Sequence, residues 1–199
     1  MTACQQLFTA SGLTGSALQS AVEAQFPNGE CEQVPVSPFS PGPVADGETL
    51  TRLIFHPVHT HPHTGVPIAM AFADAWSSDL SVFREERATD AEITLAIEQM
   101  KQTGLKKTPL QDRSVIGVMT ATTARVRSEV TANDNVRAFR VYDTAEELKP
   151  HHASVFLTHA GRTKFTEKVA RKRLFEIFAA VSNYRTGRLP TEPSATGTI

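Results

Sequence analysis

Apolar residues recur with a helical period in three parts of this chain. Residues 16–26 place three apolar side chains four positions apart, which predicts a short amphipathic helix. Residues 89–104 begin with Thr-Asp-Ala-Glu, a capping-box sequence, and Gly104 is well placed to end that helix. The longest apolar stripe lies within residues 162–184 and predicts the longest helix, with basic side chains on its opposite face.

Shorter apolar runs, which alternate with polar residues or are rich in β-branched and aromatic residues, predict strands. They lie at residues 50–57, 66–76, 80–86, 114–121, 136–144 and 152–158. The order of elements lacks a regular alternation of strand and helix, so a doubly wound parallel sheet is not favoured. The sequence predicts an α+β fold, with a mixed, largely antiparallel sheet of about five to six strands packed by two to three helices.

Residues 34–48 interrupt the regular pattern with four prolines and two glycines, which sustain neither a helix nor a sheet ladder. We expect this segment to be a linker or a strap along the surface. Residues 1–188 are expected to form a single domain that contains it, and residues 189–199 a flexible tail.

The composition is that of a globular protein, with 40% hydrophobic and 21% charged residues. No apolar run approaches the roughly 20 residues needed to span a bilayer, and the first residues lack the pattern of a targeting peptide. These features predict a cytoplasmic protein without a membrane partner. Cys4 and Cys31 are the only cysteines, and we interpret them as free thiols.

Charge is distributed unevenly, although the net charge is −1. The first fifty residues contain no Lys or Arg, whereas residues 161–188 contain eight basic and two acidic residues. This asymmetry permits a nucleic-acid or protein partner bound through the basic helix, or docking of one end of the chain on the other; a solvated helix face is the simpler alternative. The candidate partner-binding residues are Lys164, Lys168, Arg171, Lys172, Arg173 and Arg185.

The segment HPVHTHPHTG, residues 56–65, holds four of the seven histidines. His59, His61 and His63 alternate, so on an extended chain their imidazoles could converge on zinc. The segment lacks a cysteine or carboxylate, and it matches no known zinc signature. A solvated loop joining two strands is the favoured interpretation, and no cofactor is expected.

Polar residues within the expected strands are the other candidates for chemistry. Arg52 lies in an apolar strand and must either pair with an anion or emerge on an exposed face. Ser81 could be a pocket hydroxyl or a plain surface residue. His152, at the start of a strand, could point inward, or its ring could be satisfied by backbone groups.

Three stretches, LTRLIFHP, AMAFADAWSSDLSVFREE and YDTAEELKPHHASV, resemble a pattern in small uncharacterised bacterial proteins with no established activity. The shared features are an Arg-bearing strand, an Ala-Phe, a Leu-Ser-Val, and an aspartate shortly before His-Ala. The resemblance implies that Arg52, Ser81, Asp143 and His152 share a cleft.

Two classes of function follow from these observations. The leading hypothesis is a binding or accessory module that contacts an anionic partner through its basic C-terminal helix. The alternative is an enzyme, which would use either a histidine-bound zinc ion or Arg52 as an anion holder and His152 as an acid or base.

Overall fold

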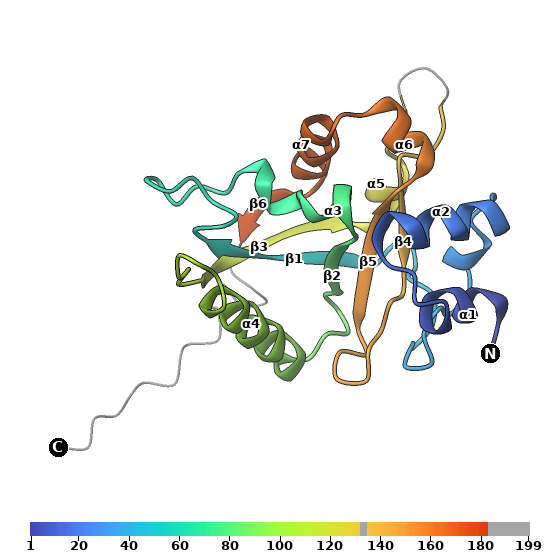
Figure 1. The fold of residues 1–199 in the computed structure, drawn as a ribbon, viewed down its shortest axis with the longest axis horizontal. Coiled ribbons are helices and arrows are strands. Elements are labelled where there is room, and N and C mark those ends of the chain that lie inside the picture. Colours follow the sequence, from blue (N-terminus) through green and yellow to red (C-terminus); the bar gives the residue numbers. More distant parts are fainter. Residues whose placement is uncertain (132–134, 183–199) are drawn as a thin grey trace.

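Six strands form one antiparallel sheet at the centre of the molecule (Figure 1). The structure is a computed structural model that describes residues 1–131 and 135–182. The strands are β1 (Thr49–His56), β2 (Leu80–Arg84), β3 (Ser114–Thr122), β4 (Phe139–Tyr142), β5 (His152–Leu157) and β6 (Ala179–Ser182). Their order is β4-β5-β2-β1-β3-β6, and every neighbouring pair is antiparallel. The expected α+β class is therefore confirmed.

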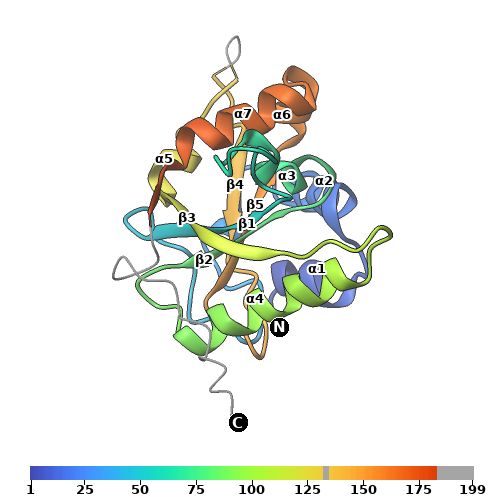
Figure 2. The same cartoon turned by 90° about the vertical axis from the view of Figure 1, so that its left-hand side faces the viewer.

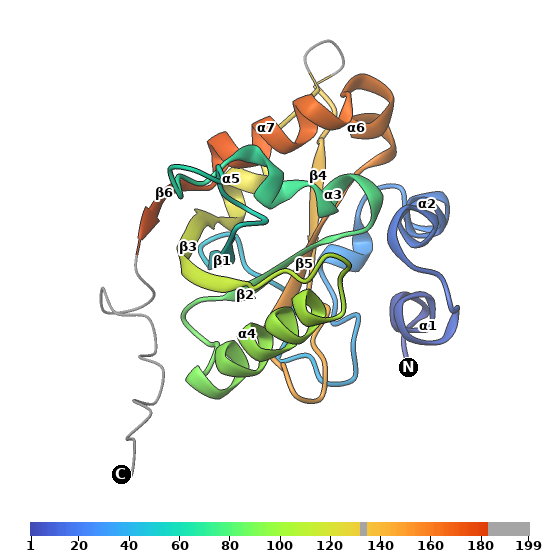
Figure 3. The ribbon, with the colours of Figure 1, turned by 60° about the vertical axis from the view of Figure 1, so that its left-hand side comes forward.

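Helices cover both faces of the sheet and one end of it (Figures 2 and 3). They are α1 (Ala3–Ala10), α2 (Gly15–Gln25), α3 (Asp74–Ser77), α4 (Asp90–Leu105), α5 (Thr123–Arg127), α6 (His159–Lys164) and α7 (Glu167–Ile177), with 3₁₀ turns η1 (Glu30–Glu32) and η2 (Ala69–Phe72). Helix α7 and turn η2 lie over one face, α4 over the other, and α1 and α2 beside β4 and β5. No helix in the described ranges is long and apolar enough to cross a membrane.

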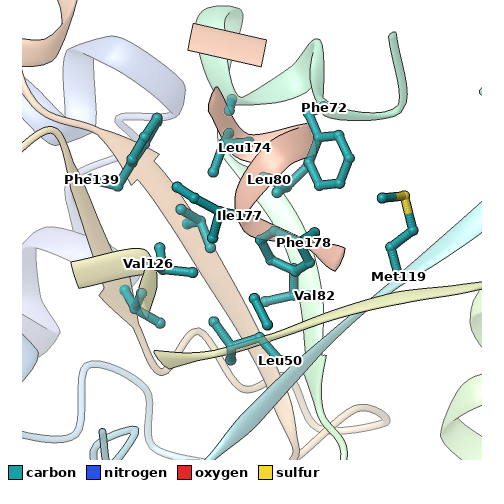
Figure 4. Close-up of a cluster of buried hydrophobic side chains, with 14 of the residues drawn as sticks. Leu50, Phe72, Leu80, Val82, Met119, Val126, Phe139, Leu174, Ile177 and Phe178 are labelled. Carbon is teal, nitrogen blue, oxygen red and sulfur yellow. The ribbon is translucent and has the colours of Figure 1, made fainter. Parts of the chain in front are cut away.

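The alternation within β1 sends its side chains into two different cores. Leu50 and Ile54 join the larger core, which packs under α7 and η2 with Phe72 and Phe178 (Figure 4). Leu53 and Phe55, on the opposite face of β1, pack instead against α4. Successive β1 side chains lie on opposite sides of the sheet. Because a core covers each side, the β1 side chains are buried on both faces.

The N-terminal helices pack on β4 and β5 through a third core, which a disulfide closes. Cys4 in α1 and Cys31 in η1 are bonded, with their Cα atoms 5.5 Å apart. The interpretation of these cysteines as free thiols is therefore wrong. Helix α1 was not expected either, although Thr2 and Gln5 form a capping box at its start. The apolar side chains of α1 pack against Tyr142 and Phe156, which are distant in the sequence, so local periodicity did not indicate this helix.

Two expected elements differ in the structure. Residues 66–76 were expected to form a strand, but they form η2 and α3, and their alanines favour helical turns. The expected helix over residues 162–184 is broken, because Phe165 is extended and the Thr166 side chain accepts a hydrogen bond that starts α7 afresh. Residues 179–182 then leave the helix and pair with β3, which supplies a free sheet edge.

Residues 34–48 contain no helix or strand, as expected, but they are held firmly against the body. Arg84, which is fully buried, donates to the carbonyls of Gly42 and Pro43 at 2.7 and 3.2 Å. Arg127 donates to the carbonyl of Val44 at 3.0 Å. These buried guanidinium groups satisfy carbonyls that a proline-rich segment cannot pair in a ladder, so the segment is a strap. The proposed tail at 189–199 lies outside the described residues.

Candidate functional site

Arg52 lies where the ladder between β1 and β2 stops after two residue pairs. Its guanidinium donates to the carbonyls of Ser81 at 3.0 Å and Ala71 at 3.2 Å. Its Nη2 also donates to Asp74 Oδ2 at 2.8 Å. The Arg52 side chain is 6% exposed, so a positive charge is held inside the sheet by neighbours that use three of its five N–H groups.

Ser81 and His152 are hydrogen-bonded across the ladder between β2 and β5. Ser81 Oγ lies 2.6 Å from His152 Nε2. His152 Nδ1 lies 3.2 Å from the carbonyl of Thr144, which can only accept a hydrogen bond. Burial, followed by the charge of Lys149, keeps the pKa of His152 below its ordinary value, so the ring is neutral near pH 7. Its one proton then lies on Nδ1, and Nε2 accepts from Ser81.

A chain of hydroxyl groups extends this pair toward a carboxylate. Thr144 Oγ1 is 3.0 Å from His152 Nδ1 and 2.7 Å from Ser154 Oγ. Ser154 Oγ in turn donates to Asp79 Oδ2 at 2.5 Å. Ser154 is opposite Ser81 in the strand register, so the polar side chains of β2 and β5 lie on the same face. The network fixes the ring orientation of His152.

Ser81 and Arg52 open onto a cavity of about 200 Å³ between α4 and the sheet. We call this the α4 cavity, and its polar lining is Arg52, Asp74, Ser81, Gln99, Thr103 and Lys149. Lys149 Nζ lies 3.4 Å from Gln99 Oε1 and 2.9 Å from Glu146 Oε2. The lining thus combines two basic side chains, one carboxylate and a hydroxyl that is bonded to a histidine.

An adjoining cavity of about 540 Å³ shares Asp74 and Met100 with the α4 cavity. It adds Lys107, His59 and Arg113 to the lining. Arg113 is buried, and among the described residues it has no carboxylate within ion-pair distance; its guanidinium contacts the Met100 sulfur and Gln111. Burial, and then the charge of Arg52, lowers the pKa of His59 to about 3, so this ring is neutral.

Asp143, the fourth residue that the resemblance implied, belongs to a different cluster. Its Oδ1 lies 3.6 Å from Arg84 Nη1, and it accepts a hydrogen bond from the Ser40 hydroxyl on the strap. Burial raises the pKa of Asp143 to about 6, against the opposing effect of Arg84. Its contacts are with the strap and Arg84 rather than with Arg52, Ser81 or His152.

The three histidines of the loop do not converge. His59 is buried, and its Nδ1 accepts the backbone N–H of Phe55 at 3.2 Å. His61 and His63 are exposed, with their ring centroids 5.7 Å apart. Within the described ranges, no group of three or more His, Cys, Asp or Glu side chains could hold a metal ion. The geometry gives the zinc hypothesis no support.

Much of the positive charge on α7 is paired with acids. Arg171 lies 3.0 Å from Glu167, and Lys172 lies 3.6 Å from Glu176. Arg173 lies within 3.6 Å of Glu129 and Glu176, while Lys164 and Lys168 are exposed. Arg185 lies outside the described residues. The basic face is therefore less positive than the sequence indicates.

Several residues of the site gave no sequence signal. Thr144, Ser154 and Asp79 are ordinary polar residues whose roles depend on strand register. Lys149 and Asp74 meet at the α4 cavity from a loop and a short helix. Nothing local in the sequence marks these residues, because the strand register and the packing of α4 bring them together only in the folded chain.

Comparisons with known proteins add nothing to this picture, since no family model, curated protein or solved structure matches the chain. The resemblance to small bacterial proteins has no support from them.

Proposed function

We propose that this protein binds a small anionic molecule in the α4 cavity. The observation that carries the proposal is the pair of basic side chains, Arg52 and Lys149, on the wall of a cavity that contains one carboxylate. Arg52 retains two N–H groups beyond its contacts with described residues, enough for a bidentate hydrogen bond to a carboxylate or phosphate. Buried charge of this kind binds an anion more strongly than exposed charge, because water screens it less.

An anionic macromolecule bound along α7 is the other form of this hypothesis. It receives less support, since Arg171, Lys172 and Arg173 already lie beside glutamates. A nucleic-acid partner would require these pairs to exchange for phosphates, and its binding would weaken steeply with salt.

Titration with succinate and with inorganic phosphate, followed by NMR amide shifts, tests the anion site. We expect saturable shifts at Arg52, Ser81 and Lys149, and a loss of about fivefold in affinity in Lys149→Gln, since a part-buried ion pair contributes about 1 kcal/mol. Lys168→Gln, an exposed lysine on α7, is the matched control and should bind as the wild type does. Shifts confined to α7, or equal affinity in Lys149→Gln, would contradict the proposal.

Hydrolysis of an anionic ester is a second candidate function, favoured by the 2.6 Å contact between Ser81 Oγ and His152 Nε2. In an activated nucleophile, a hydroxyl is hydrogen-bonded to a neutral histidine whose other ring nitrogen donates a hydrogen bond to an acceptor, and Ser81 and His152 have this arrangement. Ser81 Oγ would attack the ester carbonyl carbon while His152 Nε2 takes the hydroxyl proton. His152 would return that proton to the leaving alkoxide as the C–O bond breaks, and water would then hydrolyse the acyl-serine by the same route.

The hydrolytic proposal predicts that Ser81→Ala lowers the rate with a nitrophenyl ester of succinate by about 10³-fold, as loss of a nucleophile does. The same variant should still bind succinate, which separates catalysis from binding. Because the pKa of His152 is lowered, the wild-type rate should persist below pH 6.5 before it falls. Ser128→Ala, at an exposed serine, is the control. A rate unchanged in Ser81→Ala excludes this activity.

The Cys4–Cys31 disulfide bears on the compartment in which the protein is found. Disulfides form and persist mainly in oxidising compartments. The Cys4–Cys31 bond therefore supports an oxidising compartment rather than the expected cytoplasm.

A further inference from the structure

A third cavity, larger than the α4 cavity, lies where the N-terminal helices and the strap meet β5. Its volume is about 530 Å³, within the range of about 300–1,000 Å³ that is typical of small-molecule sites. We call it the N-terminal cavity. Its apolar lining includes Phe8, Leu13, Leu18, Val36, Phe39 and Phe156. The two helices, the strap and the strand each supply part of this wall, so the cavity exists only in the folded chain.

Two apolar side chains of this lining are open to solvent. Leu13 is 37% exposed and Phe39 is 47% exposed, from the loop between α1 and α2 and from the strap respectively. Exposed apolar area beside an apolar cavity is costly in water, and a ligand that covers it removes that cost. The occupant therefore has an apolar body.

The charged side chains of the same cavity are acidic. Asp79, Glu146 and Glu147 are in the lining, to which the described part of the chain contributes no lysine or arginine. Asp79 accepts a hydrogen bond from Ser154, and among the described residues no basic side chain lies within ion-pair distance of it. A carboxylate can accept about four hydrogen bonds, so Asp79 retains acceptor capacity toward the cavity. Glu146, by contrast, lies 2.9 Å from Lys149.

We propose that the N-terminal cavity binds a small molecule with an apolar body and an ammonium group. The body lies against Phe8, Leu18 and Phe156, and the ammonium group lies against Asp79. This site is separate from the α4 cavity and has the opposite charge preference. His152 lines the N-terminal cavity, while its hydrogen-bonded partner Ser81 lines the α4 cavity, so the two sites meet at this pair.

Three octyl compounds that differ only in their polar group test the proposal. Octylammonium, octan-1-ol and octanoate are titrated separately into the ¹⁵N-labelled protein. We expect shifts at Phe8, Leu13 and Phe39, and an affinity for the ammonium compound about tenfold above that for octanoate, as one charge-assisted contact gives. Equal or tighter binding of octanoate overturns the proposal, and so does the absence of shifts at these residues.

Variants locate the site and its charge. Thr9, which lines the cavity, and Thr163, which does not, are exposed helical threonines whose hydroxyls donate to the carbonyl four residues earlier. Thr9→Trp should weaken binding by placing an indole in part of the cavity, and Thr163→Trp should bind as the wild type does. Asp79→Asn keeps an acceptor for Ser154 and should reduce the ammonium affinity to that of octan-1-ol. Unchanged binding in Thr9→Trp or Asp79→Asn contradicts the assignment.

The two proposals fail independently. Succinate binding reports on the α4 cavity and should not change in Thr9→Trp. If the wild-type protein does not bind succinate, the proposed function is wrong, whereas the proposal of an ammonium site is unaffected.

Discussion

Replacing Glu32 with glutamine is expected to lower the free energy of unfolding by about 3–5 kcal/mol, the usual cost of removing one partner from a buried ion pair. The Glu32 side chain is 1% exposed. Its Oε1 accepts from Arg127 Nε at 3.0 Å and from the backbone N–H of Val141 at 2.9 Å. Its Oε2 accepts from two further arginines, Arg137 at 2.8 Å and Arg140 at 2.9 Å.

The loss is large because three guanidinium groups converge on this carboxylate. An amide has one acceptor oxygen and no charge, so the three cations would repel one another without a central anion. Arg127 and Arg140 keep Asp46 and Glu23 as partners, at 2.7 and 3.8 Å, which limits the loss. Glu32 thus joins η1 to β4 and α5, and its replacement weakens the attachment of the N-terminal segment.

Urea unfolding of Glu32→Gln, followed by circular dichroism, measures this change. Glu30→Gln is a matched control in the same 3₁₀ turn, because Glu30 is exposed and its side chain accepts a hydrogen bond only from Asn28, at 3.2 Å, among the described residues. The control should stay within about 0.5 kcal/mol of the wild type, as surface substitutions do. A loss below 1 kcal/mol in Glu32→Gln would mean that the three arginines find other partners at little cost.

The second large effect is expected when the disulfide is removed. Cys4 and Cys31 are 27 residues apart, and closing a loop of this length stabilises a fold by about 3–4 kcal/mol through the entropy of the unfolded chain. We expect the double variant Cys4→Ala, Cys31→Ala to lose about this much. Alanine avoids a buried hydroxyl, since both positions are nearly inaccessible to solvent.

A reducing agent provides the matched comparison. The chain has no other cysteines, so reductant should bring the wild type close to the double variant and leave the double variant unchanged. The Phe8 wall of the N-terminal cavity is carried by α1, so octylammonium should also bind more weakly without the bond. A wild-type protein with two thiols that titrate freely and a stability indifferent to reductant would contradict the assignment.

Local signals in the sequence were sufficient for several elements. The Thr-Asp-Ala-Glu box does start α4: the Thr89 side chain accepts from the backbone N–H of Glu92, and the Glu92 carboxylate accepts from that of Thr89. The two residues are three apart, so tertiary contacts are not needed for this cap. The alternation in residues 50–57 predicted β1 for a similar reason. The lack of regular structure at residues 34–48 followed from proline chemistry alone, whereas the buried contacts of Arg84 and Arg127 make the segment a strap rather than a linker.

Local signals failed where a neighbour decides the conformation. Apolar residues at 66–76 are compatible with a strand or a buried helical turn. Arg52 donates hydrogen bonds to the carbonyl of Ala71 and to the carboxylate of Asp74, and these contacts hold the turns against β1. The end of the C-terminal helix was likewise determined by the open edge of β3, which pairs with residues 179–182.

The sequence by itself determined the α4 cap, the alternation of β1 and the lack of regular structure at residues 34–48, because each depends on residues a few positions apart. Only the tertiary structure decided the disulfide, the partners of Glu32 and the pairing of Ser81 with His152. These last two residues are 71 positions apart and meet because Ser81 is opposite Ser154 in the ladder between β2 and β5. A shift of one residue in that register would move His152 to the other face of the sheet, since successive side chains alternate.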